Sequence, residues 1–285
     1  MGTEVDVVVR AADRPVAAFA SVRAWFGTVE ARLSRFRAES ALERLNRGEV
    51  VDDWILAEVV RAAIAAWEST EGLVNPLVRD ALEAAGYVDS FERLEGPRGS
   101  LEPRPVPNPG DAIELSETRV RLRAGRLDLG GLAKGWTVDR AAELLSEDGL
   151  AGLVNAGGDL RAIGEEAQGL GGWRAGVEAP GSMLAWEGIV VGGLATSSLL
   201  RRRWRTRDAR WAHHIIDPRT GLPAEGPYVQ VTVAAASCLW AEVWSKAILI
   251  GGPETLRRAQ HAVDGILAVT ADGTAERTGI FAKGR

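Results

Sequence analysis

Hydrophobic positions in the first third of the chain predict one strand followed by helices. Val5, Val7 and Val9 alternate with polar residues, the period-two pattern of a half-buried strand. From Phe19 to Phe36, apolar residues recur at steps of three and four, the stripe of one long amphipathic helix. Three further helices are expected: from the Ser40 capping box to Leu45, over about 52–70, and from Asn75 as N-cap and Pro76 as first residue to a stop at Gly86.

Residues 96–110 are rich in proline, glycine and charge and predict a loop. This loop is the expected seam between a helical-rich part, 1–95, and a strand-rich part, 111–285. Helices are expected over 134–146, 239–250 and 253–263. Strands are not followed regularly by helices, which favours an α+β fold in a single domain over 1–285. The expected strands are 112–115, 119–122, 126–129, 173–177, 186–191, 229–235 and 266–270, with short ones near Leu153 and Leu160.

Composition and charge narrow the class of protein. The 285 residues are 46% hydrophobic and 26% charged, which excludes a disordered chain. The net charge of −5 excludes a global cationic field for nucleic acid or an anionic membrane. Cys238 is the single cysteine, so neither an intrachain disulfide nor a zinc ribbon can form. No targeting signal and no apolar stretch of about 18 residues is recognised, so we expect a cytoplasmic protein with no membrane contact.

Two glycine-containing segments are candidate binding sites. From Asp128 to Gly135, a strand pattern runs through two glycines into a helix that carries Lys134. Glycines let the backbone approach a ligand, and a helix start offers free N–H groups to a phosphate. A tight strand-to-helix turn explains the segment equally, but the chain has only three lysines, and a lysine here favours phosphate. The second segment, Asn155–Asp159, is either a simple hairpin or part of the same site.

Hydroxyl and imidazole groups form two further candidates. Thr196, Ser197 and Ser198 follow a Gly-Gly pair and are expected in a turn. There they would satisfy backbone groups or hold the phosphate or ring edge of a ligand. His213 and His214 are adjacent, and adjacent residues of a strand point to opposite faces. At most one of the two imidazoles is therefore expected to reach a ligand.

Two charged segments complete the candidates. Glu242 and Lys246 are four residues apart on an otherwise apolar helix, so they share one face. On a surface such a pair contributes only a few tenths of a kcal/mol, but here both groups are expected in a largely buried helix. The basic run Arg201–Arg207 includes Trp204. In an acidic chain, a solvated strand edge or a rim over an anionic ligand is favoured over single-stranded nucleic acid.

Taken in order, these segments resemble the ApbE family of FAD:protein FMN transferases over nearly the whole chain. Asp128–Asp139 is similar to the family's D-L-G-G-I-A-K-G-x-x-x-D, Ala195–Ser197 to its A-T-S, and His214–Gly221 to its H-I-I-D-P-R-T-G without change. Supporting similarities are the Met1-Gly2-Thr3 start, Ser34–Asn46 with S-R-F-x-x-x-S-x-L-x-x-L-N, Gly72–Pro76 with G-A-F-D-P, and Asn155–Asp159 with N-A-G-G-D.

The resemblance implies a T-fold-like α+β domain that binds FAD in a cleft. It implies transfer of FMN to a Ser or Thr hydroxyl of an acceptor protein, with Mg²⁺ on the diphosphate and release of AMP. By the same resemblance, Gly131 and Glu242 hold the metal, and His214, Glu242 and Lys246 are the expected catalytic residues. The cofactor-binding residues it implies are Met1, Phe36, Leu73, Val74, Asn75, Asp128, Lys134, Thr196, Ser197 and His214.

One position departs from the family. Where the family reads A-D-x-x-x-T, with Asp and Thr on the metal, this chain has Glu242 and Lys246. Glutamate can ligate Mg²⁺, but an ammonium cannot ligate a cation and repels it. Either Lys246 pairs with Glu242 or with the diphosphate and partly replaces the metal, or the protein binds FAD without transferring it. A pyrophosphatase that splits FAD into FMN and AMP is a third alternative, and the sequence names neither the acceptor protein nor the oligomeric state.

Overall fold

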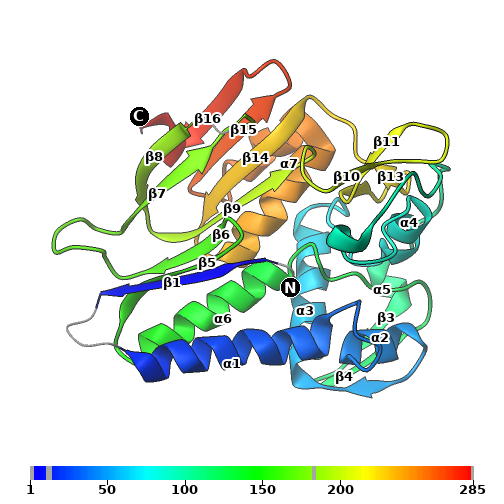
Figure 1. Ribbon diagram of the computed structural model, residues 1–285, viewed down its shortest axis with the longest axis horizontal. Helices are drawn as coiled ribbons and strands as arrows, with labels where there is room; N and C mark the ends of the chain where they lie inside the picture. The colour runs from blue at the N-terminus through cyan, green and yellow to red at the C-terminus, as the bar shows by residue number, and fades with distance from the viewer. Residues whose placement is uncertain (1–2, 11–14, 182–183, 284–285) are drawn as a thin grey trace. The chain divides into compact units, whose positions relative to one another are not determined.

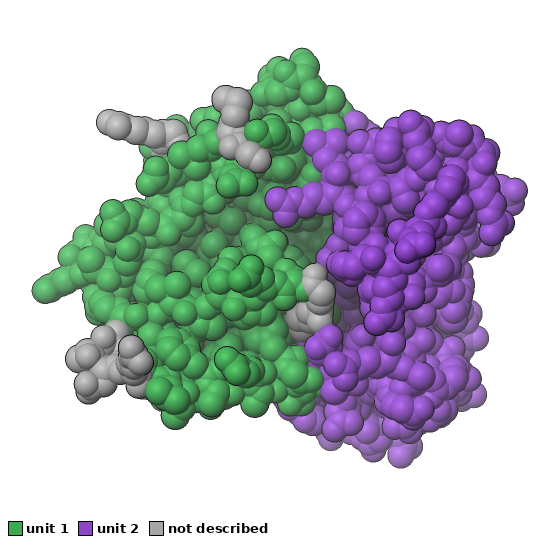
Figure 2. Space-filling model, viewed as in Figure 1, with its two compact units in different colours: residues 1–28, 132–198, 227–285 green, residues 29–131, 199–226 purple. Residues whose placement is uncertain are grey.

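A computed structural model describes residues 3–10, 15–181 and 184–283. By their internal contacts these residues divide into two compact units, shown in green and purple in Figure 2. Unit 1 consists of 1–28, 132–198 and 227–285, and unit 2 of 29–131 and 199–226. The expected seam, 96–110, lies inside unit 2, and the expected single domain stays a prediction. None of the helices in the described part of the chain is long and apolar enough to cross a membrane.

Unit 1 is built on a seven-stranded sheet in which every neighbouring pair is antiparallel. The strand order is β1-β5-β6-β9-β14-β15-β16. The tight connection between β5 and β6 uses Gly157 and Gly158, whose φ angles of 60° and 97° suit glycine. The strands are β1 (Val5–Arg10), β5 (Ala151–Ala156), β6 (Asp159–Ile163), β9 (Gly192–Ser198), β14 (Tyr228–Ala235), β15 (Gly265–Thr270) and β16 (Ala275–Gly279).

Two helices, α6 (Ala133–Glu147) and α7 (Cys238–Ala259), cover one face of this sheet (Figure 1). Helix α6 contacts β5 and β6, while α7 contacts β9 and β14. The first part of α1 (Val16–Leu33) packs beside α6, where the Trp25 and Trp136 rings are 5.5 Å apart. Buried residues of the sheet, α1, α6 and the start of α7 form one apolar core: Ala18, Val22, Val138, Ala141, Ala142, Leu145, Val154, Ala156 and Cys238.

The opposite face of the sheet is covered by a two-stranded ribbon, β7 (Trp173–Glu178) and β8 (Leu184–Val190), and by the short helix η2 (Ile280–Ala282). Trp186 and Phe281 meet edge to face there, with ring centroids 4.8 Å apart. This second core contains Leu160, Val177, Trp186, Val190, Leu194, Ala234, Leu267, Val269 and Phe281. The middle of the sheet, strands β6, β9, β14 and β15, is therefore buried on both faces.

Unit 2 consists of short helices and small sheets. Its longest helix, α3 (Trp54–Ser69), begins at the N-cap Asp53, whose carboxylate accepts from the Leu56 N–H at 2.9 Å. The strands form the sheets β2-β4-β3, β10-β11 and β12-β13. The other elements are α2 (Ala41–Asn46), β2 (Val51–Asp52), α4 (Arg79–Ala84), η1 (Phe91–Arg93), α5 (Pro109–Ala112), β3 (Ile113–Leu115), β4 (Arg119–Leu122), β10 (Arg203–Arg205), β11 (Trp211–His213), β12 (Ile216–Asp217) and β13 (Leu222–Pro223).

The predicted strand over 126–129 is wrong, because these residues pair with no neighbouring strand. The Leu127 N–H donates to Asn46 Oδ1 at 2.7 Å, and the Leu127 carbonyl accepts from Asn46 Nδ2 at 3.0 Å. The Asp128 N–H donates to the Pro76 carbonyl. One asparagine thus satisfies the backbone groups that a neighbouring strand would otherwise satisfy.

Two other expectations are corrected. Asn75 does not cap α4, since its Oδ1 accepts from Leu77 in a turn and the helix begins at Arg79. Residues 195–198 lie not in a turn but in β9, paired with β14 on one side. The capping box at Ser40 is confirmed, with Ser40 Oγ accepting from the Glu43 N–H at 3.0 Å.

Candidate functional site

Unit 1 holds a cluster of two lysines and two carboxylates, called here the lysine cluster: Lys134, Asp159, Glu242 and Lys246. Lys134 Nζ donates to Asp159 Oδ2, and Lys246 Nζ donates to Glu242 Oε1 at 3.0 Å. The two pairs also influence one another, because the charge of Glu242 acts on Lys134 and that of Lys246 acts on Asp159. The four groups therefore form one electrostatic unit with balanced charge.

Each of the helices α6 and α7 provides a carboxylate that caps the N-terminus of the other helix, and these contacts position the lysine cluster. Glu242 on α7 accepts from the Gly135 N–H in the first turn of α6, with Oε2 at 2.7 Å. In return, Asp139 on α6 accepts from the first two N–H groups of α7, those of Cys238 at 2.8 Å and Leu239 at 2.9 Å. Carboxylates are favourable at helix N-termini, where backbone N–H groups lack partners. Each helix thus fixes the start of the other.

A glycine makes this close approach of the two helices feasible. A Cβ on Gly135 would lie 2.8 Å from the Cys238 carbonyl oxygen and 2.9 Å from Glu242 Oε2. Both distances are shorter than a methyl group tolerates. The glycine of the Lys134-Gly135 pair is therefore required by packing against α7, a reason that the sequence alone did not supply.

Burial and charge oppose one another at these groups. Burial raises the pKa of Glu242, but Lys246 and Lys134 outweigh it, so the pKa of this carboxyl is lowered. Burial also disfavours the Lys134 ammonium, yet Asp159 and Glu242 raise its pKa overall. Burial raises the pKa of Asp159 despite the neighbouring Lys134. Glu242 and Lys134 are thus held in their charged forms.

The cluster is layered by depth. The side chains of Asp159 and Glu242 are 3% and 2% exposed, whereas those of Lys134 and Lys246 are 28% and 14% exposed. The carboxylates are consequently more buried than the lysine side chains that pair with them.

The predicted hydroxyl groups lie beside the lysine cluster. The Thr196 N–H donates to Asp159 Oδ1 at 3.1 Å, and the Thr196 hydroxyl lies 2.9 Å from that of Thr232. The Ser197 hydroxyl is buried and lies 2.7 Å from that of Ser245 on α7. The roles of these hydroxyl groups in binding a cofactor stay predictions. The backbone N–H of Thr196 holds the Asp159 carboxylate in position.

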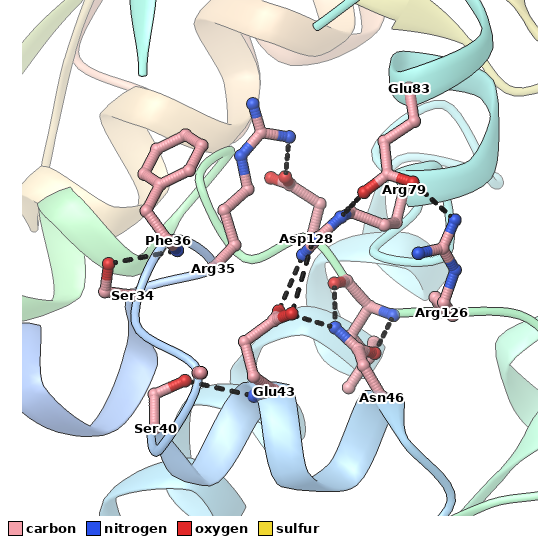
Figure 3. Close-up of polar contacts among 12 residues, drawn as sticks. Ser34, Arg35, Phe36, Ser40, Glu43, Asn46, Arg79, Glu83, Arg126 and Asp128 are labelled. Atoms are coloured by element: carbon pink, nitrogen blue, oxygen red, sulfur yellow. Dashed lines mark hydrogen bonds and ion pairs between the residues drawn. The ribbon is translucent and has the colours of Figure 1, made fainter. Parts of the chain in front are cut away.

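Unit 2 holds a second cluster, the arginine–aromatic cluster, formed by Arg35, Phe36, Tyr87, Asp128 and His214. Arg35 Nη1 donates to Asp128 Oδ2 at 2.7 Å, as Figure 3 shows. The guanidinium carbon of Arg35 is 4.0 Å from the Tyr87 ring centroid and 4.7 Å from that of Phe36. The His214 ring meets Tyr87 edge-on at 6.5 Å. Arg35 Nη2 is buried and has no hydrogen-bond partner among the residues described, so it could donate to a ligand.

A network of ion pairs lies beside the Arg35–Asp128 pair (Figure 3). Arg79 bridges Glu43, at 2.7 Å, and Glu83, at 2.5 Å. Arg126 in turn donates to Glu83 at 2.6 Å and to Asp80. Because Arg126 precedes the segment that carries Asp128, the network fixes the backbone from which the Asp128 carboxylate projects.

The two adjacent histidines differ in their surroundings. His213 is buried, with Nε2 3.1 Å from the Ala224 carbonyl oxygen and Nδ1 accepting from the Ile215 N–H at 3.3 Å. Burial, together with the charge of Arg203, lowers the pKa of His213 to about 4. Both ring nitrogens are satisfied in the neutral form. His213 is thus a structural residue, and His214 remains the histidine predicted to face a ligand.

The structure brings together some of the predicted residues. Lys134, Glu242, Lys246 and the Thr196 backbone meet in unit 1, whereas Phe36, Asp128 and His214 meet in unit 2. Leu73 and Val74 are buried, and Asn75 Nδ2 donates to the Pro107 carbonyl. Gly131 ends the first segment of unit 2, and Met1 lies outside the described residues.

Three residues of these clusters were not predicted as site residues: Asp159, Arg35 and Tyr87. Asp159 and Arg35 both lie within segments that the sequence had singled out, Asn155–Asp159 and Ser34–Asn46. A search for charges complementary to Lys134 and Asp128 would have found them. Tyr87 carries no such signal, because a lone tyrosine after a helix is most simply a core residue.

The predicted Mg²⁺ does not fit the donors of the lysine cluster. All four carboxylate oxygens already accept an N–H: Glu242 from Lys246 and Gly135, and Asp159 from Lys134 and Thr196. Ammonium groups stand where a cation would have to approach. Across 3–10, 15–181 and 184–283, no three side chains of His, Cys, Asp or Glu gather to hold a metal ion.

Comparison with known proteins defines the class of this fold, that of the ApbE flavin transferases. The ApbE protein of Thermotoga maritima superposes with a TM-score of 0.85 at 28% identity, covering 99% of this chain and 96% of that one. The flavinyl transferase ApbE of Pseudomonas stutzeri superposes with a TM-score of 0.80 and the same coverage of both chains. Because its identity is only 24%, this second structure supports the fold alone.

The chain belongs to the ApbE family, whose sequence model matches residues 1–269. The FAD:protein FMN transferase of Salmonella typhimurium is 29% identical over 257 residues, which are 81% of this chain and 69% of that protein. That of Escherichia coli is 27% identical over 269 residues, which are 86% and 74% of the two chains. The predicted family, the α+β fold and the enzyme class, a transferase, are therefore confirmed.

Proposed function

We propose that this protein transfers FMN from FAD to a Ser or Thr hydroxyl of an acceptor protein and releases AMP. The observation that carries the proposal is the lysine cluster at the start of α6, in which each lysine side chain is more exposed than its carboxylate partner. Two further facts support it. The family relatives are named FAD:protein FMN transferases, and the arginine–aromatic cluster has planar and cationic groups suited to a ring system.

The proposed reaction is a displacement at phosphorus. The acceptor hydroxyl oxygen forms a bond to the phosphorus of the FMN moiety, and the bond from that phosphorus to the bridging oxygen breaks. AMP leaves with the bonding electron pair, and the hydroxyl proton passes to a base. Charge develops on the phosphate oxygens during this step, so fixed cations beside the diphosphate stabilise the transition state.

The chain's own residues can be assigned to these tasks. Lys134 and Lys246 bind the diphosphate oxygens as charged donors, and Glu242 and Asp159 orient the two ammonium groups. In unit 2, Asp128 is a predicted cofactor-binding residue, Arg35 is its guanidinium partner, and His214 is the proposed base. His213 is not suited to this task, because both its ring nitrogens are bonded inside the fold.

The predicted Mg²⁺ would supply charge neutralisation at the diphosphate. Since the carboxylates of the lysine cluster are fully engaged with N–H donors, no step of the proposed mechanism depends on the metal. The cytoplasmic location stays a prediction as well.

A non-catalytic FAD-binding protein is the second candidate. It is favoured by the same saturation of hydrogen bonds, because neither carboxylate of the lysine cluster is free to accept the hydroxyl proton. Such a protein would retain intact FAD in the presence of any acceptor. A pyrophosphatase would instead convert FAD into FMN and AMP without an acceptor.

One experiment separates these functions. The protein is incubated with FAD and an acceptor domain that carries a threonine in its flavinylation motif, and the acceptor is analysed by intact mass spectrometry while AMP is quantified by chromatography. We expect a covalent FMN adduct and an equal amount of AMP. The acceptor with Thr→Ala is the control and should stay unmodified. Intact FAD in all samples would refute the transferase and support the binder.

A further inference from the structure

We propose that Lys246, together with Lys134, replaces a divalent cation in this protein, so that the diphosphate is bound without a metal. The identity of the ligand rests on the proposed function, whereas the exclusion of the metal rests on this chain's own side chains. The lysine cluster carries two positive and two negative groups, and each carboxylate already has a cationic partner.

The first argument is the saturation of the carboxylates. A divalent cation such as Mg²⁺ requires oxygen ligands with free lone pairs directed toward it, in near-octahedral geometry. Glu242 Oε1 accepts from Lys246 and Oε2 from the α6 backbone, 3.0 and 2.7 Å away. A metal at Glu242 would have to displace either the ammonium or a helix cap.

The second argument is the order of the groups by depth. Glu242 is almost fully buried, with 2% of its side chain exposed, whereas the side chain of Lys246 is 14% exposed. A cation at Glu242 would lie next to the Lys246 ammonium, which repels it and has no lone pair to offer. A diphosphate at the same position would meet a charged donor. Both arguments favour an anion over a cation at this place.

The third argument is that lysine can keep donating after pairing. An ammonium has three N–H donors, and the structure gives Lys246 one bond, to Glu242. Its remaining donors can bind phosphate oxygens while the salt bridge holds the nitrogen in place. Lys134 is paired with Asp159 in the same way. The carboxylates thus act as positioning residues for two phosphate-binding ammonium groups.

Metal binding by the ligand-free protein tests this directly. Mn²⁺ is titrated into the protein and free Mn²⁺ is followed by electron paramagnetic resonance, a measurement that requires neither FAD nor turnover. We expect no specific binding by the wild type. Lys246→Thr removes the ammonium, frees Glu242 Oε1 and adds a neutral oxygen donor, so its Mn²⁺ affinity should rise at least about tenfold. Stoichiometric Mn²⁺ binding by the wild type would overturn the proposal.

Matched variants isolate the role of charge. Lys246→Arg keeps a cation on Glu242 and should exclude Mn²⁺ as the wild type does, whether or not Lys246→Thr folds. Lys283→Met removes the one lysine outside the lysine cluster, which is exposed, and should change nothing. Mn²⁺ binding by Lys246→Arg equal to that of Lys246→Thr would show that the ammonium does not exclude the metal.

FAD affinity with and without EDTA gives the second readout. The wild-type Kd for FAD should change less than about twofold on chelation, whereas that of Lys246→Thr should weaken about tenfold. A tenfold loss in the wild type would refute metal-free binding. Absence of FAD binding under every condition would instead refute the proposed function, while the Mn²⁺ titration would still decide whether Lys246 excludes a metal.

Discussion

Both units bury networks of opposite charges, but unit 1 uses lysine where unit 2 uses arginine. In unit 2, Arg79 binds two carboxylates at once, and Arg126 shares one of them. In unit 1, each lysine binds one carboxylate and is the more exposed member of its pair. The planar guanidinium groups of Arg79 and Arg126 use their N–H donors to join neighbouring carboxylates. The ammonium group of a lysine that binds one carboxylate still has N–H donors for a ligand. Arg79 and Arg126 therefore form a supporting network, whereas Lys134 and Lys246 keep donors for a ligand.

The largest effect is expected from breaking the scaffold of unit 2. Arg79→Met would leave the carboxylates of Glu43 and Glu83 without their shared partner, and we expect a loss of about 3–4 kcal/mol in the free energy of unfolding, measured with urea. Arg140→Met is the control, because the Arg140–Glu143 pair is exposed and contributes at most about 0.5 kcal/mol. Similar losses in both variants would mean that the Arg79 network is not structural.

The next effect concerns the acid sensitivity of unit 2. Because the pKa of His213 is lowered to about 4 in the fold, the unfolded chain binds this proton first as pH falls from about 6.5. Stability from His213 should be complete above pH 6.5 and decrease by about 3 kcal/mol toward pH 4. The difference in unfolding free energy between wild type and His213→Gln, measured from pH 7 to 4, should shrink accordingly. His261→Gln, which removes an exposed imidazole, should leave that trend in place.

Unit 1 should respond to pH with the opposite sign. Burial raises the pKa of Asp139 to about 6 from 3.8, even though two backbone N–H groups of α7 favour its charged form. The unfolded chain therefore loses this proton first, and stability from Asp139 should fall as pH rises from about 4 to 6, by about 3 kcal/mol. Urea unfolding of Asp139→Asn against wild type measures the difference, with the exposed Asp148→Asn as control. The unfolding free energy of Asp139→Asn minus that of the wild type should therefore increase from pH 4 to 6, and a difference that decreases over this range would contradict the expected sign.

The smallest effect tests the contrast between the two cations within one site. Arg35→Lys keeps the positive charge but loses the guanidinium geometry of the hydrogen bond to Asp128 and the stacking on Tyr87 and Phe36. We expect the KM for FAD to rise about tenfold, with kcat within about twofold, because positioning is lost and charge is not. Steady-state AMP release measures both constants. Arg37→Lys, at an exposed arginine next to the cluster, is the control.

The sequence predicted the elements whose pattern is local. The alternation at Val5–Val9, the stripe of α1 and the capping box at Ser40 each depend on neighbours in sequence, and all three are found in the structure. The strand predicted over 126–129 fails because its partner is the side chain of Asn46, some 80 residues away along the chain. A pattern of hydrophobic residues carries no information about such a partner.

The same distinction holds for the candidate sites. The Glu242–Lys246 pair was predictable because helix geometry fixes a spacing of four residues. The bond from Gly135 to Glu242 and the caps that Asp139 provides for α7 join residues about 100 positions apart. They depend on how α6 packs against α7, which only the folded chain determines. The depth of each charged group, on which the exclusion of a metal depends, follows from that packing too.

Cys238 has a practical consequence for future work on this enzyme. The sole thiol of the chain is fully buried, and burial raises its pKa well above the ordinary range, so little reactive thiolate is available to an alkylating reagent. A cysteine engineered at an exposed surface position should therefore accept a maleimide fluorophore or a spin label selectively. Spectroscopic probes can be attached with the native sulfur left in its place.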